Sequence, residues 1–226
     1  MSRLGESLAL VALALAAVSC SSDGSSSGGG GGGGDPQLRA DVLAALGEDV
    51  VLPAISQFES DATALEGALG EATTSPGGRD AAQALWIDTI GTWQQLEVMQ
   101  FGPLGASRTV MGGQDLRARI YWWTLRNRCA VDRETVGESY DDPDALEQLR
   151  GVPAGLWAIE YLLFTDDPDN GCPEFDSINA EGTWDSMAEM IPQRRLDYAA
   201  SLGTLVRRRA EELAAALSPE WGNFIE

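Results

Sequence analysis

The sequence predicts an all-α fold, a bundle of helices, and three observations lead to this prediction. Apolar residues recur at three- to four-residue spacing over long stretches, which is the period of an amphipathic helix. No stretch shows the alternation of apolar and polar residues that is typical of a half-buried strand. Pro and Gly separate long helical stretches, and the 44% share of hydrophobic residues is ample for a core.

The first expected helix covers residues 36–72, in which Leu38, Val42 and Leu46 begin the apolar series. Pro53 must kink or restart this helix, because proline has no N–H to donate to the preceding turn. The series continues beyond the proline with the same spacing. We therefore expect one long helical stretch with a local irregularity near its middle.

The remaining expected helices are bounded by glycine and proline signals. The second helix ends before Gly102 and Pro103, which together stop a helix. Thr183 or Asp185 is expected to cap the last helix, and Pro192 is expected to interrupt it. The expected ranges are 79–101, 115–125, 132–150, 154–164 and 183–217.

Composition excludes several classes of function. The chain has 15 basic residues, all of them Arg, against 35 acidic ones, which gives a formal net charge of −20. Such a charge repels phosphate backbones, so we expect no nucleic-acid binding. The chain has no His, which removes Ser/His/Asp and Cys/His catalysis and every His-ligated metal site. Much of the usual enzyme chemistry is therefore excluded.

Residues 1–20 have the features of a bacterial lipoprotein signal peptide. Arg3 precedes an apolar run over residues 8–18, which is too short to span a membrane. Small residues follow and end at Cys20, as in a lipobox, where the cysteine is acylated and becomes the new N-terminus. Ser21 in place of Asp suits sorting to the outer membrane, so we expect a lipid-anchored protein of the cell envelope that faces the periplasm. An ordinary secreted protein cleaved nearby is the alternative.

A flexible tether follows the expected anchor. Residues 21–34 are rich in Ser and Gly and include seven consecutive glycines at 28–34, a composition that cannot pack. Its reach is roughly 20 Å from random-coil scaling. The globular domain is therefore expected over residues 35–226.

Two cysteines remain after the anchor. In an exported protein, an even pair such as Cys129 and Cys172 is expected to form a disulfide. A buried free pair and a pair of metal thiolates are the alternatives. A disulfide would stabilise the fold by roughly 2–4 kcal/mol, because it shrinks the unfolded ensemble.

An acidic residue lies where only apolar ones are expected. The stretch 154–164 is apolar on all sides of a helix and is therefore expected to be buried, yet it carries Glu160. A buried carboxylate needs a cation, a proton or good donors. Arg117 or Arg119 could supply an ion pair, and a metal ion or a bound ligand is the functional alternative.

Glu97 is a second carboxylate of this kind. It shares one face of the second helix with Trp86 and Trp93, at spacings of eleven and four residues. If the two helices pack together, Glu97 and Glu160 converge on one site. Paired carboxylates inside a helix bundle hold iron in some proteins, and without His the expected ions are Fe(III), Ca²⁺, Mg²⁺ or Mn²⁺.

Taken in order, these stretches resemble the imelysin-like family, bacterial envelope proteins once described as metallopeptidases and often linked to iron acquisition. The resemblance covers nearly all of residues 45–226 and rests on the joint order of its motifs. It implies an all-α bundle of the imelysin type, in this chain a single bundle where family members usually continue into a second one. The matching stretches are residues 51–58, 86–97, 101–103, 119–123, 155–164, 178–184, 195–198 and 221–224.

The hallmark of that family, Gly-x-His-x-x-Glu, stands here as Gly155, Trp157 and Glu160. The resemblance implies a metal contact at Glu160 and an acidic partner at Glu97. An indole cannot coordinate a metal, so Trp157 argues against the peptidase activity that the family description suggests.

Three functions follow from these observations. The first is a non-catalytic metal- or ligand-binding lipoprotein, linked to iron uptake through a partner protein. The second is a structural or partner-docking module in which Trp157 fills the ancestral metal site. The third, a metallopeptidase, is disfavoured because a zinc hydrolase needs about three protein ligands and usually His.

Overall fold

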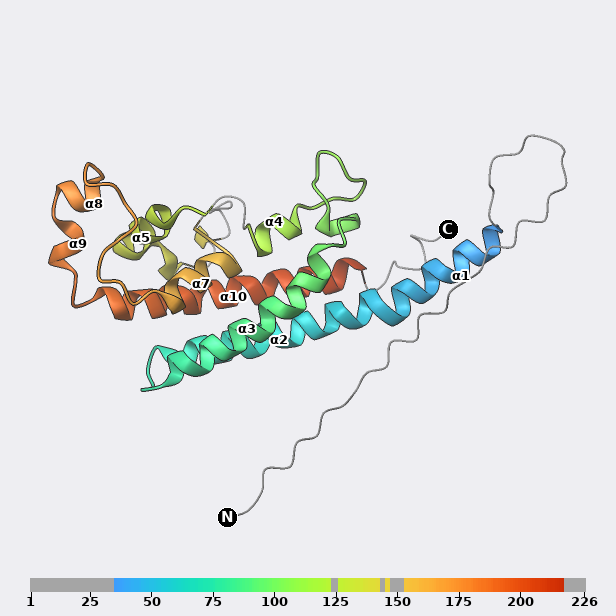
Figure 1. Ribbon diagram of the computed structural model, residues 1–226, viewed down its shortest axis with the longest axis horizontal. Helices are drawn as coiled ribbons and strands as arrows, with labels where there is room; N and C mark the ends of the chain where they lie inside the picture. The colour runs from blue at the N-terminus through green and yellow to red at the C-terminus, as the bar shows by residue number, and fades with distance from the viewer. Residues whose placement is uncertain (1–34, 123–125, 143–144, 147–152, 218–226) are drawn as a thin grey trace, which may run out of the picture. The chain divides into compact units, whose positions relative to one another are not determined.

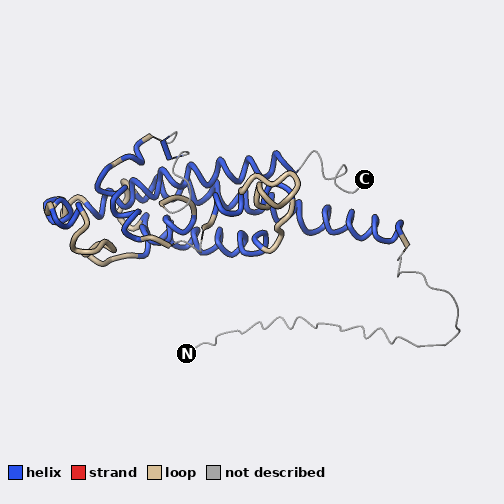
Figure 2. Tube along the Cα trace, turned by 90° about the horizontal axis from the view of Figure 1, so that it is seen from above, coloured by secondary structure: helices blue, strands red, loops and turns tan. Residues whose placement is uncertain are grey.

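The prediction of an all-α fold is confirmed, since the described residues form helices joined by turns and loops and include no strand (Figure 2). The computed structural model describes residues 35–122, 126–142, 145–146 and 153–217. The expected signal peptide with Cys20, the tether and the motif at 221–224 lie outside these residues. None of the described helices has both the length and the apolar character needed to cross a membrane.

Three long helices carry the core. α2 (Leu52–Ala72), α3 (Gly78–Glu97) and α10 (Ile191–Leu217) lie side by side, with α2 in contact with both of the others (Figure 1). α7 (Leu156–Phe164) packs against α10 and α3. Each of the long helices buries residues at three- to four-residue spacing, which is why the sequence period predicted them. In α2 these residues are Ile55, Phe58, Ala62, Leu65 and Leu69.

The irregularity expected near Pro53 is present. α1 (Pro36–Leu46) passes into a short π-helix, η1 (Gly47–Val51), and α2 begins at Leu52, so the proline falls in a first turn that needs no N–H from it. The burial expected for the apolar face of α1 does not occur. Leu38 is 61% exposed, and no residue of α1 is buried within the described part of the chain.

Several boundaries differ from those that the sequence predicts. α3 ends at Glu97 rather than at residue 101, and the last expected helix is two helices, of which α10 begins with Ile191 and Pro192 in its first turn. Residues 165–182, which lie between two of the expected helices, contain one short helix, α8 (Ser177–Ala180). The shorter elements are η2 (Gly102–Leu104), α4 (Leu116–Ile120), α5 (Arg128–Gly137), η3 (Ser139–Asp141), α8 (Ser177–Ala180) and α9 (Thr183–Ser186).

Candidate ligand-binding site

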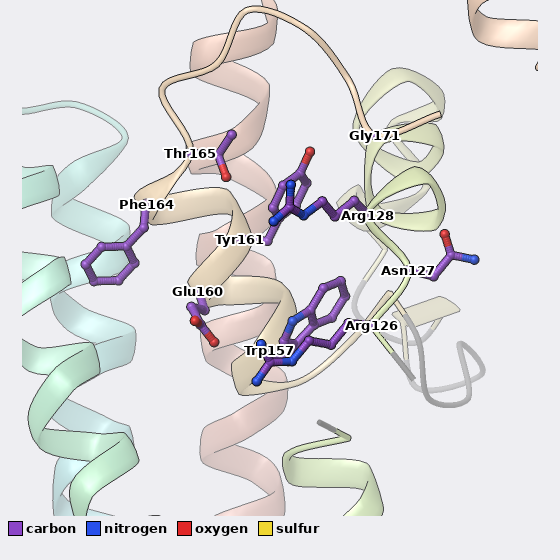
Figure 3. A pocket seen from close by; sticks show the side chains of 9 residues that line it. All are labelled: Arg126, Asn127, Arg128, Trp157, Glu160, Tyr161, Phe164, Thr165 and Gly171. Atoms are coloured by element: carbon purple, nitrogen blue, oxygen red, sulfur yellow. The ribbon is translucent and has the colours of Figure 1, made fainter. Parts of the chain in front are cut away.

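A pocket of about 570 Å³ opens beside α7, at the position of the Gly-x-Trp-x-x-Glu motif. This volume falls within the range of small-molecule sites. One wall is α7 itself, and the facing wall is the segment 126–128 that leads into α5 (Figure 3). The lining residues are Arg126, Asn127, Arg128, Trp157, Glu160, Tyr161, Phe164, Thr165 and Gly171.

Gly155 sets the position of α7. Its φ of +85° and ψ of −173° lie in a region that only glycine occupies readily. A β-carbon built on Gly155 would lie 2.5 Å from the carbonyl oxygen of Ile120. The indole N–H of Trp86 donates to the Leu156 carbonyl at 3.0 Å and fixes the first turn against α3. The glycine of the motif therefore has a packing role that is independent of any ligand.

The aromatic wall of the pocket is held from behind. Trp157 and Tyr161 lie one turn apart with nearly parallel rings, 6.3 Å between centroids. The Tyr161 hydroxyl donates to Oδ2 of Asp132 at 3.0 Å, and this carboxylate is fully buried. Burial, with the negative charge of Asp132, raises the pKa of Tyr161 well above its ordinary value, so the phenol remains protonated and keeps donating.

The loop that follows α7 closes this side of the pocket. The Gly171 N–H donates to the same Asp132 oxygen at 2.7 Å, and Cys172 forms a disulfide with Cys129 of α5. The loop approaches α5 so closely that a β-carbon on Gly171 would lie 2.4 Å from the Arg128 β-carbon. The bonded cysteines are those for which the sequence predicts a disulfide, and they fix the wall that carries Arg128.

A buried arginine completes the network behind the pocket. Nη1 of Arg195 donates to the carbonyls of Thr165 and Asp167 at 3.3 and 3.0 Å. Its Nη2 lies 3.9 Å from Oδ1 of Asp132. Burial raises the pKa of Asp132 above its ordinary value, whereas Gly171, Tyr161 and Arg195 oppose that shift. The network therefore joins α5, the loop and α10 through one buried acid and one buried base.

The two carboxylates singled out in the sequence have different surroundings. Glu97 forms an ion pair with Arg117 at 3.4 Å, and Arg119 pairs with Glu212, so neither arginine pairs with Glu160. Within the described residues, Glu160 forms no ion pair and lines the pocket, partly exposed. Glu97 therefore has a structural role in an ion pair, whereas Glu160 remains accessible to a ligand.

Tyr121 links these two acids. Burial raises the pKa of its phenol, the charges of Glu160 and Glu97 add to the shift, and Arg126 opposes it. Both carboxylates therefore act electrostatically on one phenol. Arg117 and Arg126 are part of the same group, so its two negative charges are matched by two positive ones.

This donor set does not fit a metal of the kind that the family description implies. Trp157 replaces the imidazole, and Glu97 is already neutralised by Arg117. In the part of the chain that the structure describes, one group of three candidate metal donors lies together, formed by Cys129, Cys172 and Asp176. Its two sulfurs are bonded to each other, so they are not thiolates.

Several residues of the site were not predicted from the sequence. Asp132 begins a stretch for which the sequence predicts only a helix, although its side chain is fully buried. Arg126 and Arg128 lie in a stretch to which no function was given. A usable signal existed for Tyr161, because it follows Trp157 by four residues on a helix expected to be buried. No local pattern indicated Asp132 or Arg195, whose partners are distant in the chain.

Comparison with known proteins identifies one family. The family model described as imelysin, a peptidase family, matches residues 51–226. The matched region contains α2 and all the described elements that follow it, and with them the whole pocket. No curated protein and no solved structure matches the chain.

Proposed function

We propose, from the premise that this chain belongs to the imelysin family, that it is a non-catalytic ligand-binding protein of the bacterial cell envelope. A lipid on Cys20 anchors it to the outer membrane, and the tether at residues 21–34 lets the domain move in the periplasm. The ligand occupies the pocket beside α7.

One observation supports this proposal above all: the pocket lies at the family motif, where Glu160 has no ion-pair partner among the described residues. At the position where the motif has histidine, this chain has Trp157. A zinc hydrolase needs an open coordination position on a metal held by about three protein ligands. The described residues offer one unpaired carboxylate at the pocket instead. Binding without peptide hydrolysis is the function that this arrangement supports best.

The role of iron follows from the same charges. The group around Tyr121 is electrically balanced, so it has no excess negative charge with which to hold a bare cation. A link to iron uptake therefore runs through an organic ligand or a partner protein rather than through an ion bound by Glu97 and Glu160.

Elemental analysis and calorimetry of the full-length chain test this proposal. With Fe(III), Fe(II), Zn²⁺ and Ca²⁺ we expect no stoichiometric metal and no protease activity. Glu160→Ala and Glu97→Ala are compared with Glu189→Ala, an exposed acid outside the pocket. One metal per chain, lost in the first two variants and kept in the third, would contradict the proposal and restore a carboxylate metal site.

The exposed apolar face of α1 favours a second candidate, a partner-docking module. Leu38, Val42 and Leu43 are about half exposed or more, which is unusual for apolar residues arranged on one helix. Val42→Asp separates the two functions, since it leaves the pocket unchanged. If the chain is a ligand-binding protein, the Val42→Asp variant still binds its ligand. If the chain is a partner-docking module, the variant no longer associates with other envelope proteins.

A further inference from the structure

In the part of the chain that the structure describes, two arginines of the pocket have no carboxylate within ion-pair distance, although acids outnumber bases by more than two to one in the sequence. Arg126 and Arg128 form no ion pair with any described residue. Most of the other described arginines do: Arg79, Arg117, Arg119, Arg133, Arg194, Arg195, Arg207 and Arg209. Arg126 interacts with the Tyr121 phenol and Arg128 acts electrostatically on the buried Asp132, but neither is held by a carboxylate at ion-pair distance, and both are exposed. Both guanidinium groups are therefore free to bind an anion from outside the chain.

Arg128 is held in position by its neighbours. Its guanidinium carbon lies 5.6 Å from the centroid of the Tyr161 ring, a cation–π arrangement that orients the group. Its β-carbon packs against Gly171, and the next residue is bonded to Cys172. The side chain is therefore ordered before a ligand arrives, which lowers the entropy cost of binding.

The segment that carries both arginines adds two further sources of positive potential. Asn127 caps α5 by accepting from the Ala130 N–H at 3.1 Å through its Oδ1, so its amide N–H₂ stays available as a donor. The N-terminal end of the ten-residue helix α5 lies at the same place, and its dipole favours negative charge. Figure 3 shows Arg126 and Arg128 extending from this segment toward α7.

The wall opposite the arginines is aromatic with a single acid. Trp157 and Tyr161 line it, whereas Figure 3 shows the Phe164 ring turned away from the arginines, and it packs edge-on against Trp86 of α3 at 5.4 Å between centroids. Glu160 lies on this wall, where it repels an anion but accepts a hydrogen bond from a donor group. The two walls thus differ in chemistry, with cationic donors on one side and flat apolar surface on the other.

We infer that the pocket binds an organic oxyanion, a carboxylate or phosphate attached to a planar apolar body. This rests on the proposed function and names its ligand class. The oxyanion is bound by the forks of Arg126 and Arg128, and the planar body lies along Trp157. Arginine forks suit both anions, because their paired N–H groups match two oxygens.

Calorimetric titration of the full-length chain with benzoate and with phenyl phosphate tests the inference, with neutral benzamide as the matched ligand control. Arg126→Gln and Arg128→Gln should each weaken binding by about 10- to 100-fold, which is what loss of a charged hydrogen bond costs. Arg39→Gln, which removes an exposed arginine on α1, should leave the affinity unchanged. Glu160→Gln should tighten binding several-fold, because Glu160 is the one acid among the described residues that line the pocket.

The sign of the Glu160→Gln effect separates this inference from a metal site, in which the same substitution would abolish binding. The inference is overturned if benzamide binds as well as benzoate, or if the two arginine variants bind the anions like the parent chain. It also fails if neither anion binds at about 10 mM. Failure of the proposed function has a different readout, which is stoichiometric metal or protease activity in the metal-binding experiment described under Proposed function.

Discussion

Gly155→Ala is expected to lower the free energy of unfolding by roughly 3 kcal/mol or more, because two penalties add at this position. An alanine at φ +85° and ψ −173° is strained whatever its surroundings. Its β-carbon would also meet the backbone of Ile120 at 2.5 Å, and a backbone carbonyl cannot rotate away as a side chain can. Relief requires α7 to move from α4, which would open the wall of the pocket.

Urea unfolding at equilibrium measures this effect, and two other glycines serve as controls. Gly182→Ala places alanine at φ +68° with no atom near the new methyl group, so we expect a loss of about 1 kcal/mol. Gly70→Ala lies inside α2 with open space around it and should stabilise the chain by about 0.5–1 kcal/mol. A loss at Gly155 no greater than the loss at Gly182 would mean that α7 adjusts freely.

Arg195→Ala is the second substitution with a large expected effect, a loss of about 3–5 kcal/mol. The arginine is 5% exposed and donates to two loop carbonyls, which would lose their donor. Its guanidinium carbon also lies 5.5 Å from the Trp184 ring and 6.0 Å from the Tyr161 ring. Removing it leaves Asp132 buried without its cation.

Arg207→Ala is the matched control, since Arg207 lies on the same helix and pairs with Glu66 and Glu211. Both of those acids are more accessible to water, so the expected loss is below about 1 kcal/mol. Urea unfolding of both variants at neutral pH makes the comparison. Equal losses would show that the buried network contributes no more than a surface ion pair.

The effect of Arg195→Ala should depend on pH. The pKa of Asp132 in the folded chain is raised above the ordinary 3.8, so the stability linked to its proton is lost as the pH rises above that value. Arg195 opposes the rise, and its removal therefore raises the pKa further. The loss caused by the substitution should be smallest near pH 4 and grow toward about pH 7. A loss that does not change over this range would show that Asp132 does not titrate there.

The helices could be predicted from the sequence because their apolar period is a local signal. The spacing of Ile55, Phe58 and Ala62 is visible along the chain, and so is the apolar character of α7. Helix ends were less accurate, since α3 ends at Glu97, five residues before the Gly102 and Pro103 signal. The exposure of Leu38 was not predictable either, because periodicity describes one helix and not its partners.

The site could be predicted only in part. Glu160 and Glu97 were found because a carboxylate among apolar residues stands out in any sequence. The partner of Glu160 could not be chosen from the sequence, since Arg117 and Arg119 were both candidates, and the structure pairs Arg117 with Glu97 and Arg119 with Glu212. Asp132 and Arg195 are 63 positions apart in the numbering and meet only in the folded chain. The spacing of residues along the chain therefore gives no indication of such a pair.

The place of α10 in the chain has a consequence for the order of events during folding. α10 packs against α2, α4, α5 and α7, and it follows every one of them in the sequence. Roughly 120 residues separate the end of α2 from the start of α10, so α2 is synthesised long before the helix that covers part of its apolar face. Contacts so distant in sequence form slowly. A growing chain of this kind has no closed core until its last described helix is complete. α2 and α3 can pair earlier, but closure of the core is expected only after the chain has been made through Leu217.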